Sequence, residues 1–207
     1  MKIKPILFST PMVQANSAGI KTQTRRVIDE HHYGFLEWAF KDKKNLAEWI
    51  FRNAKYRMGD ILYVRESFCV SNDMMRGKFL YKAKVEKESS LKLKYKPSIH
   101  MPREAARQFI KILSVRLERL QNISKTDAIA EGILPLTMSN AQMIEMGQQY
   151  FDYSKPAEIM NDGLDPVSSF KSLWQKINGK KIPWNENPIV WVYEYELCEK
   201  PINFLTT

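Results

Sequence analysis

The sequence has little cysteine and histidine. Among its 207 residues, only Cys69 and Cys198 carry thiols, and only three residues are histidine. Two cysteines form no disulfide framework, and neither they nor His31 and His32 have the spacing of a zinc site. We therefore expect a protein of the reducing cytoplasm, without disulfides and without a bound metal or cofactor.

Long hydrophobic runs are also missing. No uninterrupted apolar segment approaches the ~20 residues that cross a bilayer, and residues 1–5 lack the apolar stretch of a secretory signal. The sequence also has no glycine-rich phosphate loop and no Ser/His/Asp pattern in a recognisable context. We expect no membrane partner, and these motifs give no signal for nucleotide-hydrolase or serine-hydrolase chemistry.

Positive charge is abundant but unevenly distributed. The net charge is +9; residues 1–120 hold 25 Lys/Arg against 12 Asp/Glu, whereas residues 121–207 hold 7 against 11. Lysines and arginines placed on phosphates release condensed counterions, so a basic segment suits a polyanionic partner. The alternative is a solvated lysine-rich face that keeps the protein soluble.

The pattern of apolar residues and turns predicts a mixed α+β domain. Strands are expected over 3–8, 22–28, 61–70, 79–85, 108–120 and 189–197, and helices over 11–18, 124–132 and 165–178. Thr10 and Pro11 suit the start of the first helix, and Gly19 suits its end. Strands with such non-local spacing favour a small β-barrel with flanking helices over a parallel sheet.

Two segments differ in character from this framework. Residues 29–57 are aromatic-rich and mostly helical in pattern, and residues 134–165 are rich in Met, Asn, Gln and Pro. We interpret them as insertions in a single domain that spans residues 1–207. The first insertion could act as a lid or side wall.

Strand alternation makes a specific prediction about Glu66. In the 61–68 segment it shares a face with Leu62, Val64 and Phe68, so its carboxylate is expected to be buried. A buried charge needs a cationic or hydrogen-bonding partner. The candidates on the turn after the first helix are Lys21, Thr24 and Arg26, which meet Glu66 if these two segments pack together.

Two interpretations of this group remain open. It could be a structural ion pair that fixes strand order, or Lys21, Thr24 and Glu66 could surround a reactive cavity. A threonine nucleophile needs a base, and a lysine serves as one only when it is neutral. Burial and neighbouring arginines lower the pKa of a lysine, whereas a nearby carboxylate raises it.

Two further surfaces have alternative interpretations. Residues 91–96 alternate apolar and basic side chains, which places lysines on one face. That face could contact phosphates, or the lysines could protect an exposed sheet edge from aggregation. Trp191, Tyr193 and Tyr195 share a face of the last strand, where they could stack bases or form core.

The turn Gly19-x-Lys21-x-x-Thr24-x-Arg26 resembles the G-x-K-x-x-T-x-R signature of the ASCH domain family, a branch of the PUA-like fold. The segment 58–68 resembles the second block of that family. Segments 96–103, 127–133, 174–179 and 184–188 resemble larger ASCH-like proteins encoded by bacteriophages and prophages. Together the matched blocks run from about residue 4 to 197, apart from 29–57 and 134–165.

This resemblance implies a small PUA-like β-barrel in the cytoplasm of a bacterial host cell. It further implies binding of RNA or a modified nucleoside, with DNA as an alternative, and hydrolysis of an N4-acetylcytidine-type amide. By motif, Lys21 would be the base, Thr24 the nucleophile and Glu66 the acid or orienting carboxylate. The basic residues expected to bind nucleic acid are Arg25, Arg26, Arg65, Lys92, Lys94, Lys96 and Arg103. The alternatives are a non-enzymatic nucleic-acid-binding module, a ribonuclease and a phage assembly-associated protein.

Overall fold

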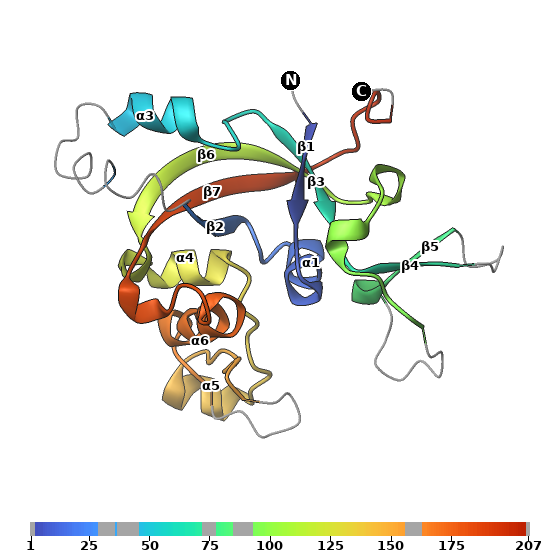
Figure 1. Cartoon of the computed structure of the whole chain (residues 1–207). Coiled ribbons are helices and arrows are strands. Elements are labelled where there is room, and N and C mark those ends of the chain that lie inside the picture. The colour runs from blue at the N-terminus through green and yellow to red at the C-terminus, as the bar shows by residue number, and fades with distance from the viewer. Residues whose placement is uncertain are drawn as a thin grey trace. The chain divides into compact units, whose positions relative to one another are not determined.

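The computed structural model describes residues 3–28, 36, 46–71, 78–84, 93–155 and 163–205. The chain forms two compact units, shown together in Figure 1. Unit 1 comprises Met1–Gly19, Met58–Leu113 and Tyr195–Thr207, and unit 2 comprises Ile20–Arg57 and Ser114–Glu194. No described helix has both the length and the apolar character needed to cross a bilayer.

Unit 1 is built on the parallel pair β1 (Ile3–Leu7) and β3 (Ile61–Arg65). The antiparallel strand β6 (Phe109–Arg119) pairs with β3, with Leu62 opposite Ile110. Helix α1 (Thr10–Ser17) follows β1 in the chain and has Pro11 in its first turn. The N–H groups of a first helical turn have no partner within the helix, so the missing N–H of proline costs nothing there. These strands confirm the segments expected over 3–8, 61–70 and 108–120, whereas the parallel pairing of β1 with β3 was not predicted.

A short ribbon extends unit 1. Strands β4 (Phe68–Val70) and β5 (Phe79–Tyr81) pair antiparallel and lead into a 3₁₀ turn, Lys82–Lys84. Lys96 exchanges backbone hydrogen bonds with Phe68 across an isolated bridge, so Lys96 lies beside the first residue of β4. The buried cluster of this unit contains Phe68, Met101, Ala105, Ala106, Phe109 and Phe204.

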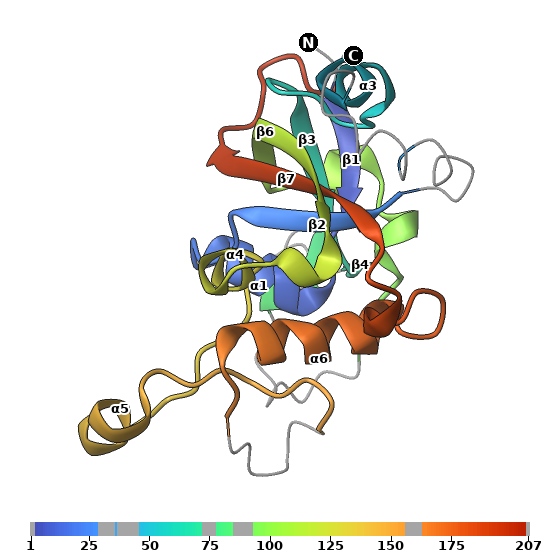
Figure 2. The same cartoon turned by 90° about the vertical axis from the view of Figure 1, so that its left-hand side faces the viewer.

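Unit 2 is built on β2 (Gln23–Val27), which pairs antiparallel with β7 (Ile189–Cys198). Figures 1 and 2 show α4 (Lys125–Ala130) and α6 (Pro166–Asn178) on one side of this pair and α3 (Leu46–Asn53) on the other. Its buried cluster lies between the strands and the α4–α6 side. The cluster contains Leu120, Ile123, Ala128, Ile133, Tyr150, Phe170, Trp174, Trp184, Val190 and Val192.

The strands do not close into the expected barrel. They form a five-stranded sheet in the order β1-β3-β6-β7-β2, in which β6 and β7 each run through both units. Within the described residues, β1 and β2 stand at the two ends of this order rather than paired with each other. The mixed α+β class is confirmed, and the closed barrel is wrong.

The expected strand over 61–70 is interrupted at Glu66. The Arg65 carbonyl accepts from the Phe8 N–H at 3.0 Å, whereas the Glu66 N–H donates to the Met101 sulfur at 3.1 Å. Glu66 therefore leaves the strand ladder, and β4 begins only at Phe68. The backbone breaks where a buried carboxylate must reach its partner.

Other differences have local causes. Ser9 rather than Thr10 is the N-cap of α1. In the strand expected over 108–120, Leu113 is 43% exposed, whereas Phe109, Ile110 and Ile112 are buried. The expected strand over 79–85 ends at Tyr81 and is followed by the 3₁₀ turn.

The two segments interpreted as insertions contain helices. In 29–57 the described part includes α3, while residues 29–35 and 37–45 lie outside the described residues. In 134–165, α5 (Asn140–Met146) begins with a capping box of Ser139 and Gln142 that was not predicted from the sequence.

Gly19 ends the turn of α1 with a positive φ of 71°. We expect Gly19→Ala to lower the free energy of unfolding by about 1 kcal/mol, because an alanine in this conformation brings its Cβ close to the carbonyl. Nothing lies within 4 Å of the added Cβ, so backbone strain alone sets the effect. Chemical denaturation measures it.

Gly19→Asn is the matched variant, since asparagine tolerates the left-handed region better than alanine. It should recover part of the lost stability. Equal stability of Gly19→Ala and the wild type would show that the turn relaxes without strain.

Candidate functional site

The segment after Gly19 is held against the end of α4 in unit 2. The Thr22 N–H donates to the Ala130 carbonyl at 2.9 Å, and Gly132, with φ of 86°, ends the α4 segment as predicted. This anchoring directs the Lys21 side chain inward, where the residue is only 1% exposed. Lys21 is therefore a buried residue and not part of a basic surface.

Among the described residues, three oxygen atoms accept hydrogen bonds from the Lys21 amine. Its Nζ donates to the Gln23 carbonyl at 2.8 Å, to the Glu131 carbonyl at 2.7 Å and to Glu131 Oε2 at 3.2 Å. A protonated lysine has three N–H donors and no acceptor, so this arrangement matches the ammonium form. In the structure as it stands, Lys21 is a fully engaged donor.

Burial opposes that charge. Removal from water is the largest effect and lowers the pKa of Lys21. The charge and hydrogen bond of Glu131 raise this pKa, whereas the charges of Arg26 and Arg25 lower it. Together these effects leave the pKa of Lys21 below its ordinary value. Lys21 therefore loses its proton more readily than an exposed lysine.

Glu131 is the centre of a buried ion network. Its Oε1 accepts from Arg25 at 3.1 Å while Oε2 accepts from Lys21, and both basic side chains are almost fully buried. Arg25 also contacts Glu118 at 2.8 Å and Asp127 at 3.0 Å. Arg116 contacts Glu118, Asp127 and Glu194. The network joins β2, β6, β7 and α4 within unit 2.

Thr24 lies on the opposite face of β2 from Arg25. It is 1% exposed and stands opposite Tyr193 of β7. Within the described residues its hydroxyl has no hydrogen-bond partner. A buried hydroxyl without a partner costs about 1–3 kcal/mol, and such an exception in a folded protein needs an explanation.

Glu66 lies in unit 1 and is buried as predicted, at 1% exposure. Its partner is Arg107, which binds both carboxylate oxygens, at 2.7 and 2.9 Å. Arg107 was not among the partners expected from the sequence. Its guanidinium also lies 4.5 Å from the Tyr81 ring centroid, which adds a cation–π contact to the pair.

The residues expected to bind nucleic acid differ in exposure. Lys94 and Lys96 are exposed, Arg26, Arg65 and Arg103 are half-buried, and Arg25 is buried in the ion network. Arg65 donates to the Ile99 carbonyl, and Arg103 lies over the Phe204 ring, 4.5 Å from its centroid. Lys92 lies outside the described residues.

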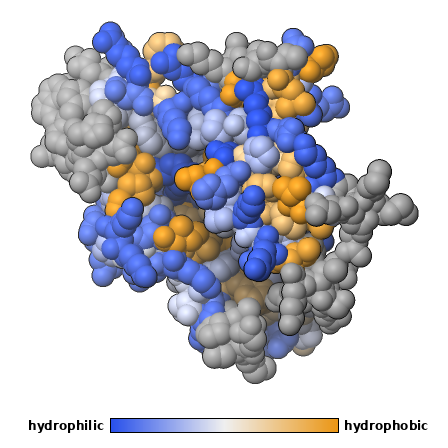
Figure 3. Space-filling model, turned by 45° about the vertical axis from the view of Figure 1, so that its right-hand side comes forward, coloured by the Kyte–Doolittle hydropathy of each residue, from blue (hydrophilic) through white to orange (hydrophobic). Residues whose placement is uncertain are grey.

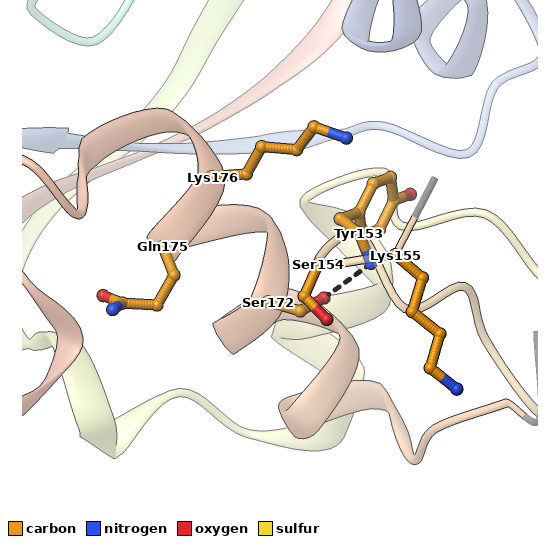
Figure 4. A pocket seen from close by; sticks show the side chains of 6 residues that line it. All are labelled: Tyr153, Ser154, Lys155, Ser172, Gln175 and Lys176. Carbon is orange, nitrogen blue, oxygen red and sulfur yellow. Dashed lines mark hydrogen bonds between the residues drawn. The ribbon is translucent and has the colours of Figure 1, made fainter. Parts of the chain in front are cut away.

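A pocket of about 470 Å³ opens elsewhere in unit 2. It is lined by Tyr153, Ser154, Lys155, Ser172, Gln175 and Lys176. Figure 4 shows the hydrogen bond from the Tyr153 N–H to the Ser172 hydroxyl, at 2.9 Å, and the two lysines extending in different directions. None of the residues predicted from sequence lines this pocket. The described residues also contain no group of three or more His, Cys, Asp or Glu side chains placed to hold a metal.

Sequence reasoning missed Glu131 as the carboxylate partner of Lys21. One signal was available, because Glu131 is the C-cap of α4 and a helix C-terminus disfavours negative charge. An acid at that position needs a cation from another part of the chain. Arg107 gave no comparable signal, since its pairing with Glu66 depends on how unit 1 folds.

Comparison with known proteins finds a similar solved structure. No protein-family model matches the sequence, and a comparison with curated proteins finds no significant match. A crystal structure of an ASCH domain from Lactobacillus crispatus JV V101 is similar to this chain, with 10% sequence identity and a TM-score of 0.39. The match covers 95% of this chain and 79% of that chain.

The lowered pKa of Lys21 predicts a pH dependence of stability. Between that pKa and the ordinary value of 10.5, the folded protein holds Lys21 neutral while the unfolded chain still binds the proton. The free energy of unfolding therefore rises with pH in this window, by up to ~1.4 kcal/mol per pH unit. Below the folded pKa, Lys21 is protonated in both states, and this gain in stability is lost.

Urea unfolding of the wild type and Lys21→Met between pH 6 and 10 tests this. Groups other than Lys21 titrate in both proteins, so their contribution cancels in the difference in unfolding free energy, wild type minus variant. This difference should therefore increase with pH, because only the wild type contains Lys21. A difference that is constant or decreases with pH contradicts a lowered pKa.

Proposed function

We propose that this protein binds a modified nucleoside, free or within RNA, and hydrolyses an N-acyl amide of the N4-acetylcytidine type. The observation that supports this best is the buried Thr24 hydroxyl without a partner in the described residues. It lies three positions from a buried lysine with a lowered pKa. The motif that resembles the ASCH family links the same two residues.

The chemistry begins with a proton transfer. Lys21 gives up a proton to solvent, which burial favours because it lowers the pKa of the amine, and Glu131 Oε2, 3.2 Å from Nζ, orients the neutral amine. The neutral amine then leaves its contact with the Gln23 carbonyl and accepts the Thr24 proton as Oγ attacks the acyl carbon. The exocyclic amine of the nucleobase then leaves with a proton from Lys21. Water hydrolyses the acyl-threonine, which releases the carboxylic acid and regenerates the Thr24 hydroxyl.

The carboxylate in this scheme has two candidates. The family resemblance assigns the role to Glu66, whereas the contacts of Lys21 support Glu131. Both carboxylate oxygens of Glu66 already accept hydrogen bonds from Arg107 in unit 1. We favour Glu131, and parallel glutamine variants of both residues separate the two assignments.

A second candidate function is nucleic-acid binding without hydrolysis. The saturated hydrogen bonding of Lys21 supports it, since an ammonium with three acceptors has no lone pair for a proton. In that case the ion network around Glu131 is a structural support for a binding surface.

Exposed lysines of unit 1 support a polyanionic partner under both candidates. Several acids of this unit already have basic partners: Asp60 pairs with Lys4, Glu104 with Lys78, and Glu196 with Lys111. Five exposed lysines of the unit have no ion pair within the described residues: Lys82, Lys84, Lys94, Lys96 and Lys200. We name the first four the ribbon lysines, because Lys82 and Lys84 follow β5, and Lys94 and Lys96 lie just before or at the bridge to β4. In Figure 3, hydrophilic and apolar residues interleave on the molecular face in view.

Turnover of N4-acetylcytidine tests hydrolysis. We expect wild-type protein to release cytidine, and Thr24→Val to lose at least ~100-fold in rate, because it keeps the shape but removes the nucleophile. Lys21→Met should lose a similar factor, and Glu131→Gln a larger factor than Glu66→Gln.

Chromatographic detection of released cytidine measures these rates, and circular dichroism confirms that each variant is folded. Equal turnover by wild type and Thr24→Val would exclude hydrolysis at this site. A larger loss in Glu66→Gln than in Glu131→Gln would return the carboxylate role to Glu66.

Salt dependence of RNA binding tests the polyanionic partner. For a single strand, each phosphate that a lysine neutralises contributes about 0.7 to the slope of log affinity against log salt. Replacing the four ribbon lysines by glutamine should therefore reduce the slope by up to about 3, as measured by fluorescence anisotropy with a labelled oligonucleotide.

The matched control removes the same charge from exposed lysines of unit 2. It replaces Lys125, Lys171, Lys180 and Lys181 by glutamine. Its slope should stay close to that of the wild type. Equal changes in both quadruple variants would mean that net charge alone, rather than the ribbon, governs binding.

A further inference from the structure

The face of the β2–β7 pair that carries Thr24 is aromatic. In the antiparallel register, Thr24 is opposite Tyr193, and Arg26 is opposite Trp191. Cross-strand partners share a face of a sheet, so these four side chains lie on the same side. The alternate residues, Arg25 and Val192, face the ion network and the buried cluster of unit 2.

Aromatic rings of the 29–57 segment cover this face. The Trp49 ring of α3 is stacked on Trp191, with centroids 5.6 Å apart and an interplanar angle of 10°. Trp191 in turn stacks on Tyr193 at 6.2 Å and 26°, and Tyr56 meets Tyr193 edge-on at 5.2 Å. Trp191 is 7% exposed, so Trp49 and its neighbours keep its ring away from water.

Helix α3, which carries Trp49, is not anchored by buried residues. None of the eight residues of α3 is buried. Its ion pair between Arg52 and Glu48 is exposed, and Phe51 is 66% exposed. A helix of two turns has little stability of its own, so its position depends on contacts such as the Trp49–Trp191 stack.

We propose that Trp191 is a stacking platform for a nucleobase, and that Trp49 occupies this platform until a base displaces it. A nearly parallel, planar heterocycle on Trp191 is the geometry that a stacked base requires. The exchange of one stacked ring for another conserves most of the contact area. The site rests on the proposed function, because it supplies a base-binding position for the same nucleoside.

Two features of β2 place the proposed stacking position close to Thr24. Arg26 and Thr24 are two residues apart on β2, so they are about 7 Å apart along the strand. A base stacked on Trp191 beside Arg26 would therefore extend its substituents toward Thr24 within the length of a nucleoside. The Arg26 guanidinium would then supply donors to carbonyl or ring-nitrogen acceptors on the base edge.

Variants of Trp49 test the proposal with cytidine, N4-acetylcytidine and a short RNA as probes. Isothermal titration should show Trp49→Ala binding these probes at least ~3-fold more tightly than wild type, because the competing ring is gone. Trp191→Leu should bind at least ~10-fold more weakly. Phe51→Ala is the matched control on α3, since Phe51 is exposed, and its affinity should equal that of the wild type.

Thermal unfolding accompanies each measurement, because Trp49 could instead be a packing residue. If Trp49→Ala unfolds, Trp49→Leu keeps an apolar side chain without the stacked ring and should also bind more tightly. Unchanged or weaker binding by a folded Trp49 variant overturns the proposal, as does an absence of binding to all probes.

The outcome for this site can be separated from that for hydrolysis. Tighter binding by Trp49→Ala without turnover in any variant supports the platform and rejects the hydrolase. Turnover that is abolished by Thr24→Val, with a KM unaffected by Trp49→Ala, supports the hydrolase and rejects the platform.

Discussion

The buried ion pairs of Glu131 are the interaction on which the described structure of unit 2 depends. One carboxylate binds Lys21 through one oxygen and Arg25 through the other, and both basic side chains are almost without solvent contact. Removing one partner from such a group costs about 3–5 kcal/mol, because it leaves a charge buried without compensation. The network thus fixes the turn after Gly19, the end of α4 and the start of β2 relative to one another.

Strand alternation on β2 separates Arg25 and this network from the face that carries Thr24. Arg25 faces the ion network and the buried cluster, whereas Thr24 and Arg26 face the aromatic residues of β7. The rigid ion pairs on one side therefore hold the threonine hydroxyl on the other. This arrangement gives a physical reason for a dense charge cluster in a protein proposed to bind a neutral base: most of the cluster positions the strand, and only Lys21 and its partner Glu131 enter the proposed chemistry.

Unit 1 uses the same kind of device on a smaller scale. Glu66 interrupts the strand ladder to reach Arg107, and the guanidinium is stacked on Tyr81 next to β4. Burial of this pair supports the start of the ribbon, beside which the exposed lysines lie. Acidic partners neutralise Lys4, Lys78 and Lys111 of the unit, whereas the ribbon lysines and Lys200 have no ion pair within the described residues.

The sequence by itself determined the local structure: Pro11 and Gly19 marked the ends of the first helix, Asp165 and Pro166 the start of α6, and alternation the burial of Glu66. These features depend on backbone preferences and on the period of a strand, which act over a few residues. The partners of buried charges were decided only by tertiary structure. Lys21 meets Glu131 across 110 positions and Glu66 meets Arg107 across 41, and the open strand order depends on equally distant pairings. A sequence shows that a buried charge needs a partner, but many residues have the right charge, and only folding selects one of them.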